Sequence, residues 1–258
     1  MTYNIRNSGA GDGPNHWELR RDQWVSIVRQ FDPDLLGVQE VLADQYDYLK
    51  EQFPDYTLVG VAREDGHRLG EWSLILYRKT RFKELKTGNF WLSETPNVPG
   101  SKSWDAACCR LCTWARLRDK QTKKKLKFVN LHLDHAGEIS RRESAEALMV
   151  ELGVDCSGDA IILTGDFNCT EVDIPYSILT NDARLIDSYR TVHPIRQANE
   201  SSFHNFGQPT TGLRIDWILH SPRLEAIQAA IDRTRGTDGR CASDHDAVTA
   251  VLQWLDEK

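Results

Sequence analysis

Several features that would place a chain quickly in a functional class are missing from this sequence. No run of about 18 apolar residues occurs, so no membrane-spanning helix is expected. Neither a Gly-rich phosphate loop of the Walker type nor a GxSxG nucleophile motif is present. The first residues, MTYNIRNSGAGDG, lack the basic-then-apolar pattern of a secretory signal. These absences argue against a membrane protein, a P-loop nucleotide hydrolase and a serine hydrolase.

The charge balance is mildly acidic. The chain carries 32 Lys and Arg against 38 Asp and Glu, a formal net charge of −6 at pH 7. Proteins that bind long nucleic acids usually carry a basic stripe instead. The one basic run, KQTKKKLK at 120–127, is predicted to be the tip of a hairpin rather than a nucleic-acid patch. Composition therefore disfavours a long nucleic acid as partner, although an acidic nuclease can still act through its metal.

Cysteine usage points to free thiols rather than to a metal site. Cys109 and Cys112 form a CxxC pair, but no second Cys or His pair lies at zinc spacing. We expect thiols in the core or at its rim, which suits a reducing compartment and predicts a cytoplasmic protein. The six cysteines are Cys108, Cys109, Cys112, Cys156, Cys169 and Cys241.

Hydrophobic periodicity predicts an α/β sandwich of mixed sheets. The length and the 40% hydrophobic content suit one domain over 1–258, and because a strand begins almost at Met1 we expect a few residues upstream. Helical spacing predicts helices over 20–31, 43–53 and 140–152, the last with a capping box from Ser140 to Glu143. Apolar runs bounded by turn residues predict strands at 35–39, 56–62, 73–78, 127–133, 160–164, 214–219 and 247–254.

Polar residues recur at or beside the ends of these strands. Turn chemistry explains one such ending, for example the Gly-Asp-Phe-Asn that follows the strand at 160–164. It does not explain seven endings, because charges within apolar strands are rare unless they are paired. The polar residues are Asn4, Glu40, Glu71, His132, Asp134, Asp166, Asn168, Asp216, Asp244 and His245.

The residue types in this set favour a hard cation and phosphoryl transfer. Carboxylate and carboxamide oxygens suit Mg²⁺, which keeps positions for water and for a substrate phosphate. Zinc would prefer His and Cys. A His beside carboxylates can exchange protons near neutral pH. The set therefore predicts a phosphoryl-transfer site that uses Mg²⁺ or Mn²⁺, with one or two ions.

Seven motifs in order resemble the endonuclease/exonuclease/phosphatase superfamily, which has the DNase I-like fold. They cover nearly the whole chain, and the long side loops are similar to those of a bacterial and fungal subgroup of unsettled substrate. The resemblance implies a four-layer α/β/β/α sandwich with the site on the rim between its two sheets. The motifs are TYN (2–4), QE (39–40), GEWSLILYR (70–78), NLHLD (130–134), GDFN (165–168), RIDWIL (214–219) and SDH (243–245).

The resemblance also implies a metal site and its ligands. Glu40 would be the principal metal ligand. Asn4 would help to hold the metal or the phosphate, and Asp244 matches the second acidic metal contact.

The same resemblance implies the catalytic roles. Asp166 would orient or deprotonate the attacking water, and Asn168 would bind a phosphate oxygen. His245 would contact the scissile phosphate, with its tautomer held by Asp216. Two further residues match the DNase branch: His132 as a second catalytic His, and Glu71 as the carboxylate that pairs with it.

Each of these residues also has a purely structural interpretation. Asn4 could cap a turn, Glu40 could begin the helix that follows it, and Asp216 could be a surface charge. The HLDH segment that contains Asp134 and His135 could hold a metal, although a loop is the simpler interpretation. Considered singly, Asn4, Glu71 and Asp134 favour the structural interpretation, whereas the remaining set favours a site.

The catalytic set does not choose the substrate, because the superfamily acts on nucleic acids and on small phosphoesters alike. Arg suits phosphate and Trp suits a base or a sugar ring, so the pocket-wall candidates are Arg63, Asp65, Trp91, Trp104 and Arg110. The Trp residues could instead be core residues beneath a long loop, and Arg110 a structural ion pair. The prediction is a small phosphoester such as a sugar or inositol phosphate, and a DNA or RNA nuclease is the alternative. A non-catalytic binding module is disfavoured because the catalytic set is complete, and neither a membrane nor an obligate protein partner is implied.

One residue departs from the family pattern. The SDH motif is followed by Asp246 and Ala247, where the family usually has another residue and then Pro. The missing Pro could loosen the loop that carries His245 without removing a catalytic group.

Overall fold

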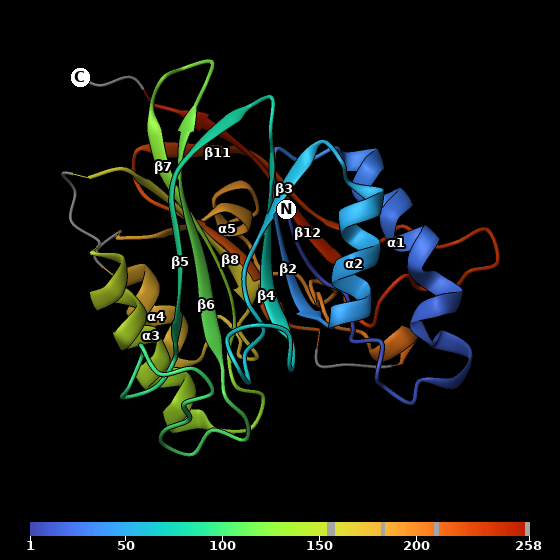
Figure 1. Cartoon of the computed structure of the whole chain (residues 1–258). Helices are drawn as coiled ribbons and strands as arrows, with labels where there is room; N and C mark the ends of the chain where they lie inside the picture. Colours follow the sequence, from blue (N-terminus) through green and yellow to red (C-terminus); the bar gives the residue numbers. More distant parts are fainter. Residues whose placement is uncertain (154–157, 182–183, 209–211, 256–258) are drawn as a thin grey trace.

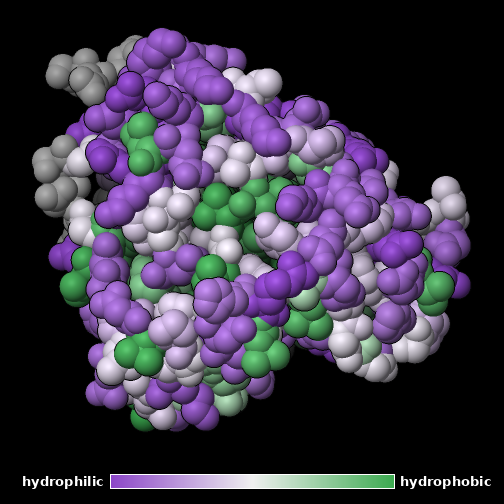
Figure 2. All heavy atoms as spheres, viewed as in Figure 1, coloured by the Kyte–Doolittle hydropathy of each residue, from purple (hydrophilic) through white to green (hydrophobic). Residues whose placement is uncertain are grey.

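Two β-sheets pack face to face, and helices cover their outer faces, which makes four layers (Figure 1). The coordinates are a computed structural model, and the structure describes residues 1–153, 158–181, 184–208 and 212–255. No helix in these ranges is both long and apolar enough to cross a bilayer. The face shown in Figure 2 is mainly hydrophilic, with apolar residues in separate patches. The predicted α/β sandwich of mixed sheets is therefore confirmed.

The first sheet contains the N-terminal and C-terminal strands. Only its β1–β2 pair is parallel, and its other neighbours are antiparallel. The order across the sheet is β11 (Leu224–Asp232), β12 (Ala247–Trp254), β1 (Thr2–Asn4), β2 (Leu35–Val41), β4 (Trp72–Arg78) and β3 (Tyr56–Val59).

The second sheet repeats this plan with the middle of the chain. Its β7–β8 pair is parallel, and its other pairs are antiparallel. The order is β5 (Phe82–Trp91), β6 (Leu111–Asp119), β7 (Lys125–His132), β8 (Ala160–Asp166), β10 (Asp216–His220) and β9 (Ile186–Asp187).

Each parallel pair is joined through a helix, because parallel strands need a long crossover connection. Helix α1 (Trp17–Phe31) joins β1 to β2, and α3 (Glu138–Leu152) joins β7 to β8. Figure 1 shows α1 beside α2 (Ala43–Gln52), and α3 beside α4 (Ile174–Thr180). Short elements with described bounds include α5 (Ser188–Val192) and the 3-10 turns η1 (Gly13–Asn15) and η3 (Asn205–Gly207).

Alternation along the strands divides the apolar core into layers. In β4, Leu74 and Leu76 pack in the cluster beneath α1 and α2, while Ile75 and Tyr77 belong to the cluster between the sheets. Such alternation follows from the two-residue period of a strand. A further cluster joins the second sheet to α3 through residues such as Leu148.

The predicted strands exist, with shifted ends. The strand predicted over 56–62 ends at Val59, and the one predicted from Arg214 begins at Asp216. The helix predicted over 20–31 starts at Trp17. The basic run at 120–127 does form a hairpin, whose turn at 120–124 joins β6 to β7. Sequence reasoning missed strands β5, β9 and β11, whereas the segment around Cys112 that reads as a strand does form β6.

The capping box predicted at Ser140 is wrong. Helix α3 begins at Glu138, and Ser140 lies inside its first turn. The backbone N–H groups of Ile139 and Ser140 instead donate to the carboxylate of Asp105, at 3.2 and 2.7 Å. A carboxylate near a helix N-terminus is stabilising whichever segment supplies it, and here it comes from the long loop between β5 and β6.

A buried polar network joins the two sheets near their centre. Asn130 of β7 donates from Nδ2 to the carbonyl oxygens of Val38 and Leu74 in the first sheet, at 3.0 and 2.9 Å. Its Oδ1 accepts from Gln39 Nε2 at 2.7 Å and from Thr164 Oγ1 at 3.1 Å. Buried amides are costly unless they are bonded in this way. The network therefore favours one alignment of the sheets over others.

Gly37 of β2 makes room for this network. A Cβ atom at position 37 would lie 2.3 Å from Thr164 Oγ1 and 2.5 Å from Asn130 Oδ1. Neither atom can retreat without breaking a buried hydrogen bond. The glycine is required here by close approach of the sheets rather than by backbone conformation.

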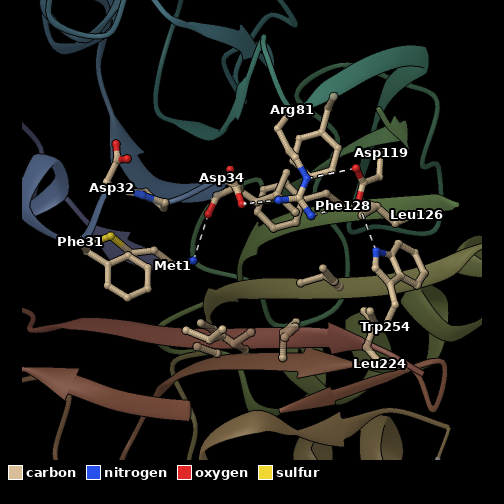
Figure 3. A pocket seen from close by; sticks show the side chains of 18 residues that line it. Met1, Phe31, Asp32, Asp34, Arg81, Asp119, Leu126, Phe128, Leu224 and Trp254 are labelled. Carbon is tan, nitrogen blue, oxygen red and sulfur yellow. Dashed lines mark hydrogen bonds and ion pairs between the residues drawn. The ribbon is translucent and has the colours of Figure 1, made fainter. Parts of the chain in front are cut away.

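Charged residues surround an apolar pocket at the end of the sandwich where β2 begins and β6 ends. The pocket has a volume of about 280 Å³ and lies between the inner faces of the sheets, against Leu126 and Phe128. Figure 3 shows Arg81 between two carboxylates, Asp34 and Asp119. Both Asp119 contacts with Arg81 measure 3.0 Å. These ion pairs bridge loops of the two sheets.

We predict that Gly37→Ala lowers the free energy of unfolding by about 1–3 kcal/mol, the usual range for overpacking. Urea unfolding followed by circular dichroism measures the change. The control is Gly11→Ala, because a Cβ there meets nothing within 4 Å. Equal stability of the two variants would show that the sheets are not locked at this point.

Candidate active site

The carboxyl ends of both parallel strand pairs meet at one rim of the sandwich. Asn4 ends β1 and Glu40 lies near the end of β2. His132 and Asp166 end β7 and β8, and they face each other in the register of the second sheet. The antiparallel strands β10 and β12 begin at the same rim. Ligands commonly bind where the carboxyl ends of parallel strands meet.

Asn4 links two carboxylates across the sheets. Its Nδ2 donates to Glu40 Oε1 and to Asp166 Oδ2, both at 3.0 Å. The other Glu40 oxygen accepts from the backbone N–H and from Nδ2 of Asn7, at 3.1 and 3.0 Å. Burial alone would raise the pKa of Glu40, but Asn4 and the nearby His245 lower it below its ordinary value. Glu40 is therefore held as a carboxylate.

Backbone strain marks the same rim. Glu40 has a φ of 64° and Asn168 a φ of 48°, in the left-handed region that side chains other than Gly rarely adopt. The backbone N–H of Asn168 donates to Asp166 Oδ1 at 2.9 Å, and this hydrogen bond stabilises the tight turn. Strained residues of this kind cluster at functional sites, where surrounding contacts hold them.

His245 lies in a chain of buried hydrogen bonds. Its Nδ1 is 2.8 Å from Asp216 Oδ2, and that oxygen also accepts from Ser202 Oγ at 2.7 Å. Its Nε2 is 3.6 Å from Asp166 Oδ2. Burial lowers the pKa of His245, but Asp216 and Asp166 outweigh it and raise the pKa well above its ordinary value. The imidazole is thus oriented with Nε2 toward Asp166.

Asp166 is the most perturbed carboxyl of the rim. Burial, helped by the neighbouring Asp216, raises its pKa to about 7. A carboxylate with such a pKa can accept a proton near neutral pH. His132 lies 3.4 Å from it through Nε2. The pKa of His132 is lowered well below its ordinary value, first by burial and then by Arg110 and Arg63.

The predicted pairing of Glu71 with His132 is wrong. Glu71 Oε2 instead binds Arg63 Nη1 at 2.5 Å. His132 Nε2 faces the Nδ2 atom of Asn168 at 2.9 Å, and His132 Nδ1 has no hydrogen-bond partner among the residues that the structure describes. A nearby guanidinium competes better than a neutral imidazole for a carboxylate, so Glu71 and Arg63 form one unit.

A cavity of about 410 Å³ opens over these side chains. Most of the residues predicted from the sequence line it, including Asp244, which is buried beside Ser243 and lies 3.6 Å from Arg6. Asn4 and Asp216 lie behind the wall and act on it through their hydrogen bonds. The predicted residues in the lining are Glu40, Arg63, Glu71, Arg110, His132, Asp166, Asn168, Asp244 and His245.

The predicted tryptophans do not line this cavity, although Phe203 does. Trp91 is buried in a small cluster with Cys109 and Leu111, and its Nε1 donates to the Arg63 carbonyl oxygen at 2.6 Å. Trp104 is not among the lining residues either. Asp65 accepts from the N–H groups of two residues in its own turn and lies outside the lining. For Trp91 the alternative of a core residue beneath the loop is correct.

Asp134 organises a loop. Its two oxygens accept backbone N–H groups at 2.8–3.3 Å, and these hydrogen bonds lower its pKa despite burial. Its donors are Ala107, Cys108, Ala136 and Gly137. Cys108 and His135 also lie near it, but the Arg110 guanidinium, 3.1 Å from His135 Nδ1, places a positive charge where a cation would sit. The loop interpretation of this segment therefore fits better than a metal site.

Most of the cysteines are core thiols, as expected. The five described cysteines are free, and all except the half-buried Cys108 are buried. Cys156 lies outside the described residues.

Asp246 follows the SDH motif at the point where the sequence departs from the family pattern. It stabilises the loop that carries His245. Its buried carboxylate binds Arg233 and Arg235 at 2.8 and 2.6 Å and lies 3.2 Å from His204 Nε2. Its N–H donates to the Ser202 carbonyl oxygen at 2.7 Å. The loop is thus held by ion pairs where a Pro would have stiffened it.

The donor set fits a hard divalent cation. One ligand atom each of Glu40, His132 and Asp166 lies within 4.8 Å of the others, and the Asp244 carboxylate lies near Glu40. Asn4 turns its Nδ2 atom toward Glu40 and Asp166, while its Oδ1 atom accepts from the Arg6 backbone N–H at 2.9 Å. Burial, with Glu40 nearby, raises the pKa of Asp244, so a cation would relieve repulsion between these acids. Oxygen-rich sets of this kind suit Mg²⁺ or Mn²⁺.

Sequence reasoning missed several residues that shape the site. Asn7 binds Glu40, and Ser202 binds Asp216. Asn7 follows the TYN motif closely enough to have been considered. Ser202 lies 14 residues before Asp216 in a loop and carries no signal of its own.

Comparison with known proteins agrees with this geometry. The profile of the Endonuclease/Exonuclease/phosphatase family matches residues 1–245. The chain belongs to this family. A crystal structure of a family member from Bacteroides vulgatus is 32% identical, covers 98% of this chain and 97% of its own, and superposes with a TM-score of 0.90.

Two further relatives bear on function. A mannosyl-6-phosphatase of Bacteroides thetaiotaomicron is 36% identical over 98% of each chain, with a TM-score of 0.89. An uncharacterized protein of Acanthamoeba polyphaga mimivirus is 29% identical over 216 residues, 79% of each chain. Members of the family are generally hydrolases of phosphoester bonds and usually depend on a divalent metal. These comparisons support a phosphoesterase or nuclease-like hydrolase.

We predict that Asp246→Ala lowers the free energy of unfolding by about 2–3 kcal/mol, because it removes the buried carboxylate that His204 and two guanidinium groups share. Chemical denaturation measures it. Asp238→Ala, which removes an exposed acid paired with Arg240, should cost less than about 1 kcal/mol. If Asp246→Ala costs no more than this control, the ion pairs do not fasten the His245 loop.

Proposed function

We propose that the protein is a divalent-metal-dependent phosphoesterase that acts on a small phosphoester, such as a sugar or inositol phosphate. The observation that carries the proposal is the position of Asp166. Its carboxylate lies within 3.6 Å of the Nε2 atoms of both His245 and His132, inside a cavity. A proton acceptor and two imidazoles around one opening suit the attack of water on phosphorus.

Asp166 is assigned the role of general base. Its pKa of about 7 allows it to take a proton from the attacking water at neutral pH. The water oxygen forms a bond to phosphorus as the bond from phosphorus to the ester oxygen breaks, and the leaving oxygen takes up a proton from solvent. Asn4 holds Asp166 Oδ2 in place from the other sheet.

His245 stabilises the charge on the phosphoryl oxygens. Its raised pKa keeps it as an imidazolium, and Asp216 fixes Nδ1 so that Nε2 faces the cavity. Asn168 Nδ2 faces His132 Nε2 at 2.9 Å and donates to the Leu133 carbonyl oxygen at 3.0 Å, so it must exchange the His132 contact in order to donate to a phosphate oxygen. His132 remains neutral and orients Asn168.

Glu40 is the principal ligand assigned to the metal, with Asn4 and Asp244 beside it. A bound Mg²⁺ or Mn²⁺ offsets negative charge that develops on the phosphoryl group. Asn7 keeps one Glu40 oxygen fixed through two hydrogen bonds.

A small substrate is favoured over a nucleic acid. The mannosyl-6-phosphatase relative acts, by its name, on a phosphorylated sugar. The net charge of −6 disfavours binding of a polyanion, which relies on Lys and Arg. The basic hairpin at 120–124 precedes β7, so it lies at the opposite end of that strand from His132. It therefore offers no basic track beside the site.

We predict that Asp166→Asn and His245→Ala each lower the kcat for a small phosphoester by at least about 100-fold, because each removes a group that acts in the transition state. Steady-state hydrolysis of p-nitrophenyl phosphate and of a panel of sugar and inositol phosphates measures the loss.

The exposed Asp238→Asn serves as the matched control and should retain full activity. Exhaustive chelation should abolish activity, and Mg²⁺ or Mn²⁺ should restore it. Wild-type turnover by either site variant, or by the chelated enzyme, would refute the mechanism. Cleavage of plasmid or single-stranded DNA that disappears in Asp166→Asn would make the protein a nuclease instead.

A further inference from the structure

Arg110 lies in the wall of the active-site cavity and carries buried donors that have no hydrogen-bond partner among the described residues. Its side chain is 5% exposed, and Nη2 lies 3.1 Å from His135 Nδ1. Its Nε and Nη1 atoms have no hydrogen-bond partner in the described parts of the chain. A guanidinium has five donors and no acceptor. Leaving buried donors unsatisfied is costly, so this arrangement indicates a group that arrives with the ligand.

The neighbouring Asp134 does not use these donors. Its Oδ2 atom lies 3.6 Å from Arg110 Nε, which is beyond normal hydrogen-bond length. Four backbone N–H groups already occupy its oxygens. Asp134 therefore orders the loop beside Arg110 and lowers the cost of burying the charge, but it leaves the Nε and Nη1 atoms of Arg110 without a hydrogen-bond partner among the described residues.

The cavity wall is divided by charge. Arg110 and Arg63 supply a cationic part, and Arg63 is held by Glu71 at 2.5 Å. The part around Glu40 and Asp244 suits a metal, and Arg6 lies in the same lining, 3.6 Å from Asp244. A phosphoryl group in this cavity would meet the guanidinium groups of Arg110 and Arg63 as well as the proposed metal ligands.

Phosphate monoesters and diesters differ in their charge and in the number of oxygens that can accept hydrogen bonds from Arg110. A monoester carries a charge of about −1.5 to −2 near pH 7 and three oxygens that accept hydrogen bonds. A diester carries one negative charge, and its third such oxygen is esterified to carbon. An additional buried guanidinium therefore matches a monoester better than a diester.

We propose that Arg110 binds the third non-bridging oxygen of the substrate, so that the site selects phosphate monoesters over diesters. Arg63, fixed by Glu71, adds positive charge beside it. This inference rests on the proposed phosphoesterase function and specifies its substrate class as terminal phosphates.

The test compares wild type with Arg110→Gln on two substrates, p-nitrophenyl phosphate and bis-p-nitrophenyl phosphate. Wild type should have the higher kcat/KM for the monoester. In Arg110→Gln the ratio of monoester to diester kcat/KM should fall about 10- to 100-fold, the range expected for hydrogen bonds to charged groups. Arg110→Lys, which keeps the charge but loses the planar donors, should recover part of the ratio. Binding of inorganic phosphate, measured by calorimetry, should weaken in Arg110→Gln by a similar factor.

The matched control is Arg116→Gln, which removes a half-exposed guanidinium of β6 outside the cavity and should leave the ratio and phosphate binding unchanged. An equal loss on both substrates in Arg110→Gln, with unchanged phosphate binding, would show a merely structural role and overturn the inference. A wild-type preference for the diester would overturn it as well. If neither ester is hydrolysed but phosphate binding still depends on Arg110, the proposed hydrolysis fails while the anion site stands.

Discussion

The buried amide of Asn130 is the contact on which the site depends. It ties β7 to the carbonyl groups of two strands in the other sheet, and Gln39 and Thr164 complete the network. Asn130 lies two residues before His132, and Gln39 immediately precedes Glu40. A shift between the sheets would therefore separate Asp166 from Asn4, which meet from opposite sheets. The Asn130 amide is fully hydrogen-bonded, which favours one arrangement of the sheets, whereas Gln39 Oε1 has no partner among the described residues.

The second constraint is the separation of charge within a buried cavity. Acids that would repel one another are held together by amide donors from Asn4 and Asn7 and by the His245 imidazolium. Arg110 and Arg63 add positive charge elsewhere in the wall. Acidic and basic side chains in one opening fit the proposed phosphoester hydrolysis, which would use a cation and a bound phosphate.

Much of the site could be predicted from the sequence because strands have a simple period and their carboxyl ends share a rim. Residues at those ends, such as Glu40 and Asp166, were found in this way, and family resemblance supplied their expected roles. What could not be predicted depends on contacts between distant loops. The partner of Glu71 is a guanidinium of a neighbouring loop, and the cap of α3 is Asp105, which lies 34 residues before Ile139. Strands β5 and β11 were missed because exposed positions interrupt their apolar pattern.

The most direct test of the account is the fate of the water oxygen. A sugar monophosphate such as mannose 6-phosphate is hydrolysed in ¹⁸O-labelled water, and the masses of the released phosphate and sugar are determined by mass spectrometry. Attack of water on phosphorus beside Asp166 predicts that the label appears in the phosphate and not in the sugar. Label in the sugar would mean cleavage of the carbon–oxygen bond and would contradict the mechanism.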